Sequence, residues 1–197
     1  TGNLIDLAQQ ISVNAIVALG MTLVILIGGI DLSVGALLAL VGTATTYALL
    51  PQGWDLPAPL AFLTGVGVAM VFGLFHGVAA SRTPMPPFII TLGTMLVARG
   101  LALRFNQGKP MGIPDAETFF LGIGNGRIGD SLPVPVLIML AAWALTAALL
   151  HYTVFGRHLY AIGDNRLAAI YSGIRVRRCE VIVYAGASLL TAVAGLI

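Results

Sequence analysis

Six long apolar segments constrain the fold of this chain more than any other feature of its sequence. They cover residues 11–28, 32–50, 58–80, 88–105, 132–155 and 181–197. At about 1.5 Å of rise per residue, each segment is long enough, or nearly so, to cross a hydrocarbon core of about 30 Å as a helix. The segments are too long for the alternating strands, about ten residues each, of an outer-membrane barrel. The sequence therefore predicts an all-α fold, a polytopic transmembrane helical bundle with about six membrane segments.

The composition supports a membrane-embedded chain. Hydrophobic residues make up 58% of the 197 positions and charged residues only 9%, whereas soluble domains carry about 25% charged residues. The mean hydropathy is +0.96, and a net charge of +2 requires no nucleic acid as partner. We predict one transmembrane domain over residues 1–197. We expect it to be a fragment incomplete at both ends, because Thr1 is not an initiator methionine and the last apolar segment has no terminating signal.

The distribution of Lys and Arg predicts the orientation of the segments, because loops on the cytoplasmic face carry an excess of these residues. One face receives six arginines, namely Arg82, Arg157, Arg166, Arg175, Arg177 and Arg178. The opposite face receives Arg104, Lys109 and Arg127, offset by Asp115, Glu117 and Asp130. We therefore expect the loop after residue 80 and the segment 156–179 to be cytoplasmic, and the loop 106–131 to be external.

Asp31 is the only charged residue between positions 11 and 50, and two glycines precede it closely. An acidic side chain near the centre of a membrane helix costs about 2.5–3.5 kcal/mol, and each glycine lowers helix propensity by about 1 kcal/mol relative to alanine. A charge and a helix break therefore coincide within residues 28–35. The residues that we predict to form this break and line a translocation pathway are Gly28, Gly29, Asp31, Ser33 and Gly35.

Two interpretations of this break are compatible with each other. In the first, residues 28–35 form a tight turn between two membrane helices, and Asp31 caps the second helix. In the second, a broken helix exposes backbone that lines a pathway, which is tolerated only where protein or water covers it. If both helices cross fully, Asp31 lies near the cytoplasmic boundary; if they are half-helices, it lies near the midplane. We favour the inner half of the membrane.

Two other segments carry polar residues within apolar sequence. Gly73 and Gly77 form a small-xxx-small pattern that predicts close packing of two helices. His76 lies between them, near the inner end of its segment, and is expected to be an interfacial histidine rather than a proton carrier. Arg99 either extends to the membrane surface or points into the bundle towards a polar substrate, and we include it among the candidate pathway residues.

The most polar inner segment, residues 155–179, predicts a short capped helix. Asp164 or Asn165 is a good N-cap, residues 166–172 suit two helical turns, and Gly173 is a natural C′ residue. Such a helix between two membrane segments is suited to dock a partner, although the positive-inside pattern alone would also explain its charge. His76, His151 and His158 have no carboxylate or cysteine at motif spacing, so the sequence predicts no catalytic residues and no metal site.

Three blocks resemble the permease subunits of ribose-type bacterial ABC sugar importers. The first is GGIDLSVG at 28–35, and the second is PPFIITLGTM at 86–95 followed by ARG at 98–100. The third runs from GR at 156–157 through YAIG at 160–163, Asn165 and AA at 168–169 to SGI at 172–174. The likeness extends over essentially the whole chain, and the order and spacing of the blocks also agree.

The resemblance implies a multi-pass permease of the bacterial inner membrane that moves a monosaccharide, such as a ribose-like pentose, a hexose or a related polyol. It implies as partners two cytoplasmic ABC ATPase subunits, a periplasmic sugar-binding protein and a second permease copy or paralogue, all around membrane lipid. The chain itself would then bind no cofactor, with ATP and magnesium held by the ATPase, and it would be no enzyme.

In this family the third block resembles the segment that meets the ATPase. The residues that we predict to couple the two subunits are Gly156, Arg157, Gly163, Asp164, Asn165, Arg166 and Gly173. Two positions depart from the family pattern: Asp164 stands where glycine is usual, and Ile170-Tyr171 stands where Arg-Leu is usual. The first change strengthens the predicted cap, and the second removes a charge from the predicted ATPase contact.

The alternative function is an ion-coupled secondary transporter of a small polar solute. Asp31 supplies the intramembrane carboxylate that such a transporter needs, but the sequence contains no second copy of residues 28–35.

Overall fold

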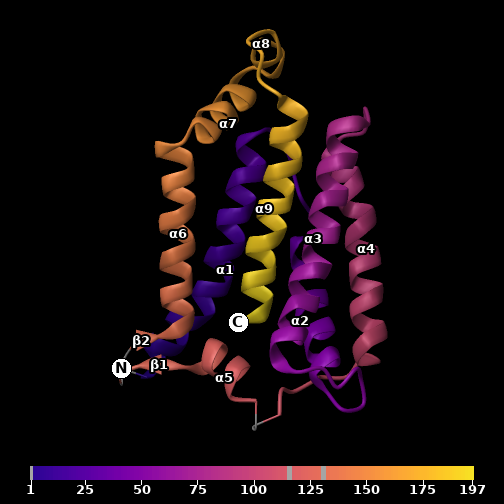
Figure 1. Ribbon diagram of the computed structural model, residues 1–197, viewed down its shortest axis with the longest axis vertical. Coiled ribbons are helices and arrows are strands. Elements are labelled where there is room, and N and C mark those ends of the chain that lie inside the picture. The colour runs from indigo at the N-terminus through magenta and orange to yellow at the C-terminus, as the bar shows by residue number, and fades with distance from the viewer. Residues whose placement is uncertain (1, 115–116, 130–131) are drawn as a thin grey trace.

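The computed structural model describes residues 2–114, 117–129 and 132–197, and Figure 1 shows how they are arranged. The elements in chain order are α1 (Gly2–Leu26), α2 (Val34–Leu49), α3 (Ala58–Arg82), α4 (Pro87–Asn106), α5 (Thr118–Asn125), β1 (Arg127–Ile128), β2 (Leu132–Pro133), α6 (Val134–Tyr152), α7 (Val154–Asp164), α8 (Arg166–Tyr171) and α9 (Val176–Leu196). Two acidic residues assigned above to the external loop, Asp115 and Asp130, lie outside the described residues.

Within the described part of the chain, five helices are long and apolar enough to cross a membrane. They are α1 from Leu7 onwards, α3, α4, α6 and α9. The helix α2 is apolar but shorter, with 16 residues. These six helices correspond in order to the six predicted apolar segments, so the predicted all-α bundle with about six membrane segments is confirmed.

Several predicted boundaries differ from the observed ones, and the largest difference is at the start of α1, which begins at Gly2 rather than at residue 11. The helix α6 ends at Tyr152 rather than at residue 155, because Thr153 is extended (φ −107°, ψ 156°) and starts α7 as its N-cap. The helix α9 begins at Val176 rather than at residue 181, because the charged residues in its first turns hide the helix from a hydropathy pattern. The loop 106–131 contains the helix α5, and its strand β1 pairs antiparallel with β2.

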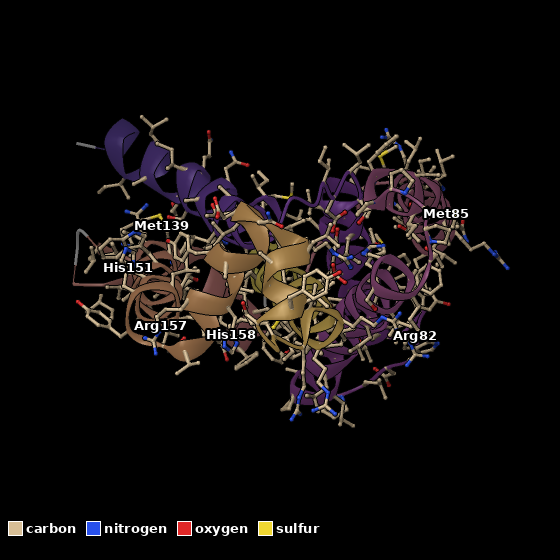
Figure 2. The ribbon with its side chains drawn as sticks, turned by 90° about the horizontal axis from the view of Figure 1, so that it is seen from above. Arg82, Met85, Met139, His151, Arg157 and His158 are labelled. Carbon is tan, nitrogen blue, oxygen red and sulfur yellow. The ribbon has the colours of Figure 1, made fainter. Side chains whose placement is uncertain are left out.

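The bundle is elongated, and its long helices run roughly along the long axis (Figure 1). The α3–α4 connection and the helices α7 and α8 lie at one end, here called the inner end, whereas α5 and the β1–β2 hairpin lie at the other. The two loops predicted to be cytoplasmic therefore share one end. Viewed from that end, Arg157 and His158 lie on one side of the molecule, and Arg82 and Met85 lie on the other (Figure 2).

The helix α9 lies at the centre of the bundle, where it packs against α1, α2 and α3. Its span is 56% buried, whereas the other four spans are 22–28% buried. A Cβ at Gly73 of α3 would lie 2.6 Å from the Oγ of Ser188, and a Cβ at Gly77 would lie 2.5 Å from the Cα of Val181. The predicted close packing through Gly73 and Gly77 is thus confirmed, and the partner helix is α9.

Candidate translocation break and coupling segment

The helix α1 ends in a glycine-dependent turn at the start of the predicted break. The N–H of Gly28 donates to the carbonyl of Ile25, and the N–H of Gly29 donates to the carbonyl of Val24, both at 2.9 Å. This pair of bonds is the Schellman pattern, which needs a left-handed residue at C′. Gly28 supplies it with φ +77°. The first glycine is therefore required by the end of the helix, because other residues are strained at this angle.

Asp31 organises the turn that leads into α2. Its Oδ1 accepts hydrogen bonds from the backbone N–H of Ser33 at 2.8 Å and from the Ser33 hydroxyl at 2.6 Å. The carboxyl group is almost fully buried, with 2% of Asp31 exposed. The N-cap position of α2 belongs to Ser33, which makes no side-chain cap bond. Asp31 is thus two residues before the N-cap, and the interpretation of Asp31 as the capping residue is wrong in this respect.

Side chains of α3 and α4 complete a buried polar group around this turn. The N–H of Leu32 donates to Thr91 Oγ1 at 3.1 Å, and His76 Nε2 lies 2.6 Å from Thr94 Oγ1. The second ring nitrogen of His76, Nδ1, lies 3.8 Å from Asp31 Oδ2, which is within ion-pair range but too long for a hydrogen bond. We call these residues the Asp31 cluster; its members are Asp31, Ser33, His76, Thr91 and Thr94.

The Asp31 cluster lies inside the bundle, towards the inner end. His76 is six residues before the end of α3 and Thr91 is four residues after the start of α4, which places them about 9 Å and 6 Å inside those helix ends. The helix α1 reaches the inner end itself, since a Cβ at Gly163 of α7 would collide with the carbonyl oxygen of Leu26. The helix α1 therefore reaches the inner end, whereas the shorter α2 begins deeper inside the bundle. This arrangement lies between the two alternatives considered for Asp31, namely two fully crossing helices and two half-helices.

The remaining residues of the predicted break lie in different surroundings. Gly29 is buried, and a Cβ there would lie 2.6 Å from the hydroxyl of Tyr184 on α9. Gly35 is exposed with open space around it. Arg99 is exposed on α4 beside the buried Ala98, so its side chain is not part of the Asp31 cluster. The pathway role of these residues stays a prediction.

A cavity of about 340 Å³ adjoins the break at its inner side. Its wall includes Gly28 and Gly29, the α3–α4 connection, and three polar side chains, Arg166, Glu180 and Tyr184. Within the described part of the chain, the hydroxyl of Tyr184 and the Oε2 of Glu180 are buried without a hydrogen-bond partner. Buried polar atoms are usually satisfied by protein or water, so this cavity is suited to hold polar molecules next to the break.

The predicted coupling segment folds as two helices, α7 and α8. Thr153 caps α7 by accepting the N–H of Gly156 at 3.0 Å. Gly156 is buried where a Cβ would collide with the preceding turn of α6, and Gly163 meets the end of α1. Arg157 is exposed on α7. The helix α7 was not expected from the sequence, and its glycines let it pack closely across the ends of α6 and α1.

The short helix α8 carries the predicted caps. Of the two candidate N-caps, Asn165 is the one used: its Oδ1 accepts the N–H of Ala168 at 3.0 Å. Asp164 instead is the last residue of α7. Gly173 follows α8 with φ +81°, as predicted for a C′ glycine.

The helix α8 is joined to α9 by an ion pair that the sequence did not reveal. Arg166 Nε and Nη2 donate to Glu180 Oε1 at 3.1 Å and 2.9 Å. The Arg166 side chain is 50% exposed and that of Glu180 is 10% exposed. Glu180 was missed because the predicted apolar segment began one residue after it. The spacing of Glu180, Tyr184 and Ser188 at every fourth position could have identified one polar face on α9.

Residues 3–197 match the protein family described as "Branched-chain amino acid transport system / permease component". The ribose import permease protein RbsC of Bacillus subtilis is 43% identical over 195 residues, which cover 99% of this chain and 59% of that protein. The corresponding protein of Escherichia coli K12 is 41% identical over 202 residues, covering 99% and 60%. The fructose import permease protein FruG of Bifidobacterium longum is 38% identical over 191 residues, covering 92% and 55%.

The resemblance to ribose-type permeases inferred from the three sequence blocks is confirmed by these relatives. The chain spans about three-fifths of the length of the ribose permeases that it matches. No solved structure matches it significantly. Its apolar helices and its relatives indicate a multi-pass protein of the bacterial inner membrane. Because the family match covers residues 3–197, the chain belongs to the family of branched-chain amino acid transport system permease components.

Proposed function

We propose that the chain is the membrane-spanning part of an ATP-driven importer that translocates a monosaccharide, either a ribose-like pentose, a hexose or a related polyol. The observation that carries this proposal is the identity of 41–43% with ribose import permeases over nearly the whole chain. A further relative is a galactofuranose transporter permease protein of Escherichia coli K12, 34% identical over 196 residues. All these names specify neutral sugars, which supports a neutral polyhydroxylated substrate.

The proposed transporter divides its work between subunits. ABC ATPase subunits on the cytoplasmic side bind and hydrolyse ATP with magnesium, and this chain holds no cofactor of its own. A periplasmic sugar-binding protein delivers the solute on the external side. A second permease copy or paralogue completes the membrane part.

Within this chain, we assign coupling to α7 and α8, with Gly156, Arg157, Gly163, Asp164, Asn165, Arg166 and Gly173 as the predicted residues. The close packing of Gly163 on the carbonyl of Leu26 supports this assignment, because Leu26 ends α1 only two residues before Gly28. A displacement of α7 by the ATPase would then reach the break directly. We assign the lining of the pathway to the break residues, namely Gly28, Gly29, Asp31, Ser33 and Gly35. The exposed Arg99 would line the pathway only if the pathway also ran along the face of α4 that lies outside the Asp31 cluster.

Reconstitution tests this function. The permease chain, its ATPase and its binding protein are assembled in proteoliposomes, and uptake of labelled D-ribose, D-fructose and D-galactose is measured with and without ATP. We expect uptake of at least one sugar that depends on ATP and on the binding protein. Uptake that follows an ion gradient without the ATPase would replace this proposal with the secondary transporter.

Asp31→Asn separates the two functions further. The amide oxygen of asparagine can still accept the hydrogen bonds of Ser33 that Asp31 Oδ1 accepts now. We therefore expect ATP-driven uptake to survive in this variant with an unchanged pH profile. Loss of ion-driven uptake, or a shifted pH profile of uptake, would indicate that the carboxylate carries a coupling ion.

A further inference from the structure

A basic groove lies between α3 and α9 at the inner end of the bundle. One part, of about 750 Å³, lies between the end of α3 and the start of α9. A second part, of about 500 Å³, continues beside it, and Ser81, Arg82, Arg177 and Arg178 line both parts. The shared lining makes them one continuous groove. We call it the α3–α9 groove.

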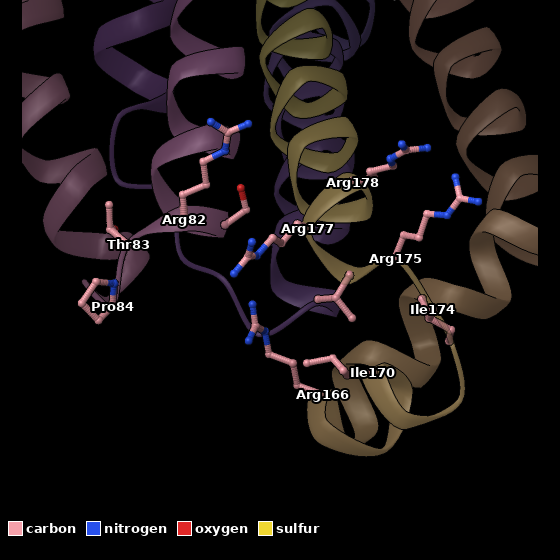
Figure 3. A pocket seen from close by; sticks show the side chains of 11 residues that line it. Arg82, Thr83, Pro84, Arg166, Ile170, Ile174, Arg175, Arg177 and Arg178 are labelled. Carbon is pink, nitrogen blue, oxygen red and sulfur yellow. The ribbon is translucent and has the colours of Figure 1, made fainter.

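The charge of the α3–α9 groove is strongly positive. Five arginines line its larger part, namely Arg82, Arg166, Arg175, Arg177 and Arg178. Figure 3 shows Arg166 and Arg177 reaching towards the gap between the ends of α3 and α9. In the described residues, Arg166 pairs with Glu180, and the other four arginines form no ion pair. A concave surface lined by one sign of charge concentrates the field and attracts anions.

The apolar side chains of the groove indicate which class of anion fits it. The smaller part is lined by Val78, Val181 and Ile182 in addition to the arginines. Val78 and Ile182 are 39% and 54% exposed, and both lie within helices long and apolar enough to span the membrane. The groove thus runs from exposed guanidinium groups at a helix end to aliphatic side chains inside the membrane-spanning region. A soluble anion would use only the first half of it.

We propose that the α3–α9 groove binds an anionic phospholipid, with the phosphate of the headgroup between Arg82 and Arg177 and an acyl chain along Val78 and Ile182. Guanidinium groups match phosphate oxygens through paired hydrogen bonds. Basic pockets between transmembrane helices on the cytoplasmic side are the usual place for anionic headgroups. The excess of arginine at this end is expected from topology alone, but topology does not require arginines of α3, α8 and α9 to line one groove with an aliphatic extension.

Lipid titration of the assembled transporter tests the site. The permease–ATPase complex is placed in nanodiscs of phosphatidylcholine with increasing phosphatidylglycerol, and the lipid that stays bound after mild delipidation is measured by native mass spectrometry. We expect retained phosphatidylglycerol in the wild type. Arg82→Gln and Arg177→Gln should each weaken this retention about fivefold, the effect of one arginine near an anionic headgroup. The matched control is Arg157→Gln, which removes one exposed arginine from the same end but outside the groove and should leave the retention unchanged.

Other outcomes overturn the proposal. Equal losses in Arg157→Gln and Arg177→Gln would mean general attraction between the basic end and the membrane, with no specific site. Competition by soluble glycerol 1-phosphate at the same concentration as the lipid would make the groove a site for a free phosphate. Unchanged lipid retention with weaker ATPase binding in Arg82→Gln would make it a protein contact. All three substituted arginines are exposed, so thermal unfolding of each variant should match that of the wild type.

Discussion

At the scale of single residues, the two consecutive glycines of the break have different physical reasons. Gly28 is needed for its backbone angle, since φ is +77° and nothing lies within 4 Å of the place where a Cβ would stand. Gly29 is needed for its size, because the hydroxyl of Tyr184 occupies the place where a Cβ would stand. One glycine ends a helix, and the other lets α9 approach the break.

The size requirement at Gly29 can be tested by a pair of substitutions. Gly29→Ala should lower the free energy of unfolding by about 1–3 kcal/mol, because its Cβ would overlap Tyr184 and crowd Val24. Adding Tyr184→Phe removes the hydroxyl and should restore part of this loss, so the two changes should not be additive. Thermal unfolding in detergent measures both effects.

Gly35→Ala is the matched control, since nothing lies within 4 Å of a Cβ at that position. It should be neutral or slightly stabilising, because alanine favours a helix more than glycine does. Additive losses in Gly29→Ala and Tyr184→Phe would contradict the close contact.

At the scale of the elements, the ends of α8 are fixed by its caps, and one ion pair joins it to α9. Asn165 and Gly173 set the two ends of α8, and Arg166 ties it to Glu180 in the first turns of α9. Arg157, on the neighbouring α7, is exposed and has no such bond among the described residues. The two arginines predicted for coupling therefore differ in what else they support.

Charge reversal separates these roles. Arg157→Glu should reduce the stimulation of the ATPase without changing the unfolding temperature. Arg166→Glu should reduce the stimulation and also cost about 1–2 kcal/mol of stability, because it places a second carboxylate beside the largely buried Glu180. The addition of Glu180→Gln to Arg166→Glu should recover stability but not stimulation. If both reversals leave stimulation at the wild-type level, α7 and α8 have no part in coupling.

At the scale of the whole molecule, the predicted orientation can be tested at positions that lie at opposite ends. Met85 in the α3–α4 connection and Tyr171 at the end of α8 are 48% and 89% exposed, and Gln107 follows α4 at the other end. In a Cys179→Ser background, cysteines at positions 85 and 171 should react with an impermeant maleimide only from the cytoplasmic side. A cysteine at position 107 should react only from the external side. Labelling of positions 85 and 171 from different sides would refute the shared inner end.

The sequence was sufficient for the fold but not for the site. Apolar length alone predicts the six helices, and local cap chemistry predicts α8 with Gly173 after it, because both depend on neighbouring residues. The Asp31 cluster depends on contacts between helices: Thr91 and Thr94 come from α4, 60 and 63 positions after Asp31. Glu180 was missed for a local reason. Its charge excluded it from the predicted apolar segment, although it belongs to the helix α9.

The central position of α9 has a consequence for how the chain tolerates length changes. One inserted residue turns the rest of a helix by about 100°. In α6, which is about one-fifth buried, that turn would mostly exchange one exposed side chain for another. In α9 it would carry Ala187 away from Gly20 of α1 and Ser188 away from Gly73 of α3 at the same time, because adjacent residues of α9 contact the two neighbouring helices. Insertions and deletions should therefore be tolerated in α6 but not in α9.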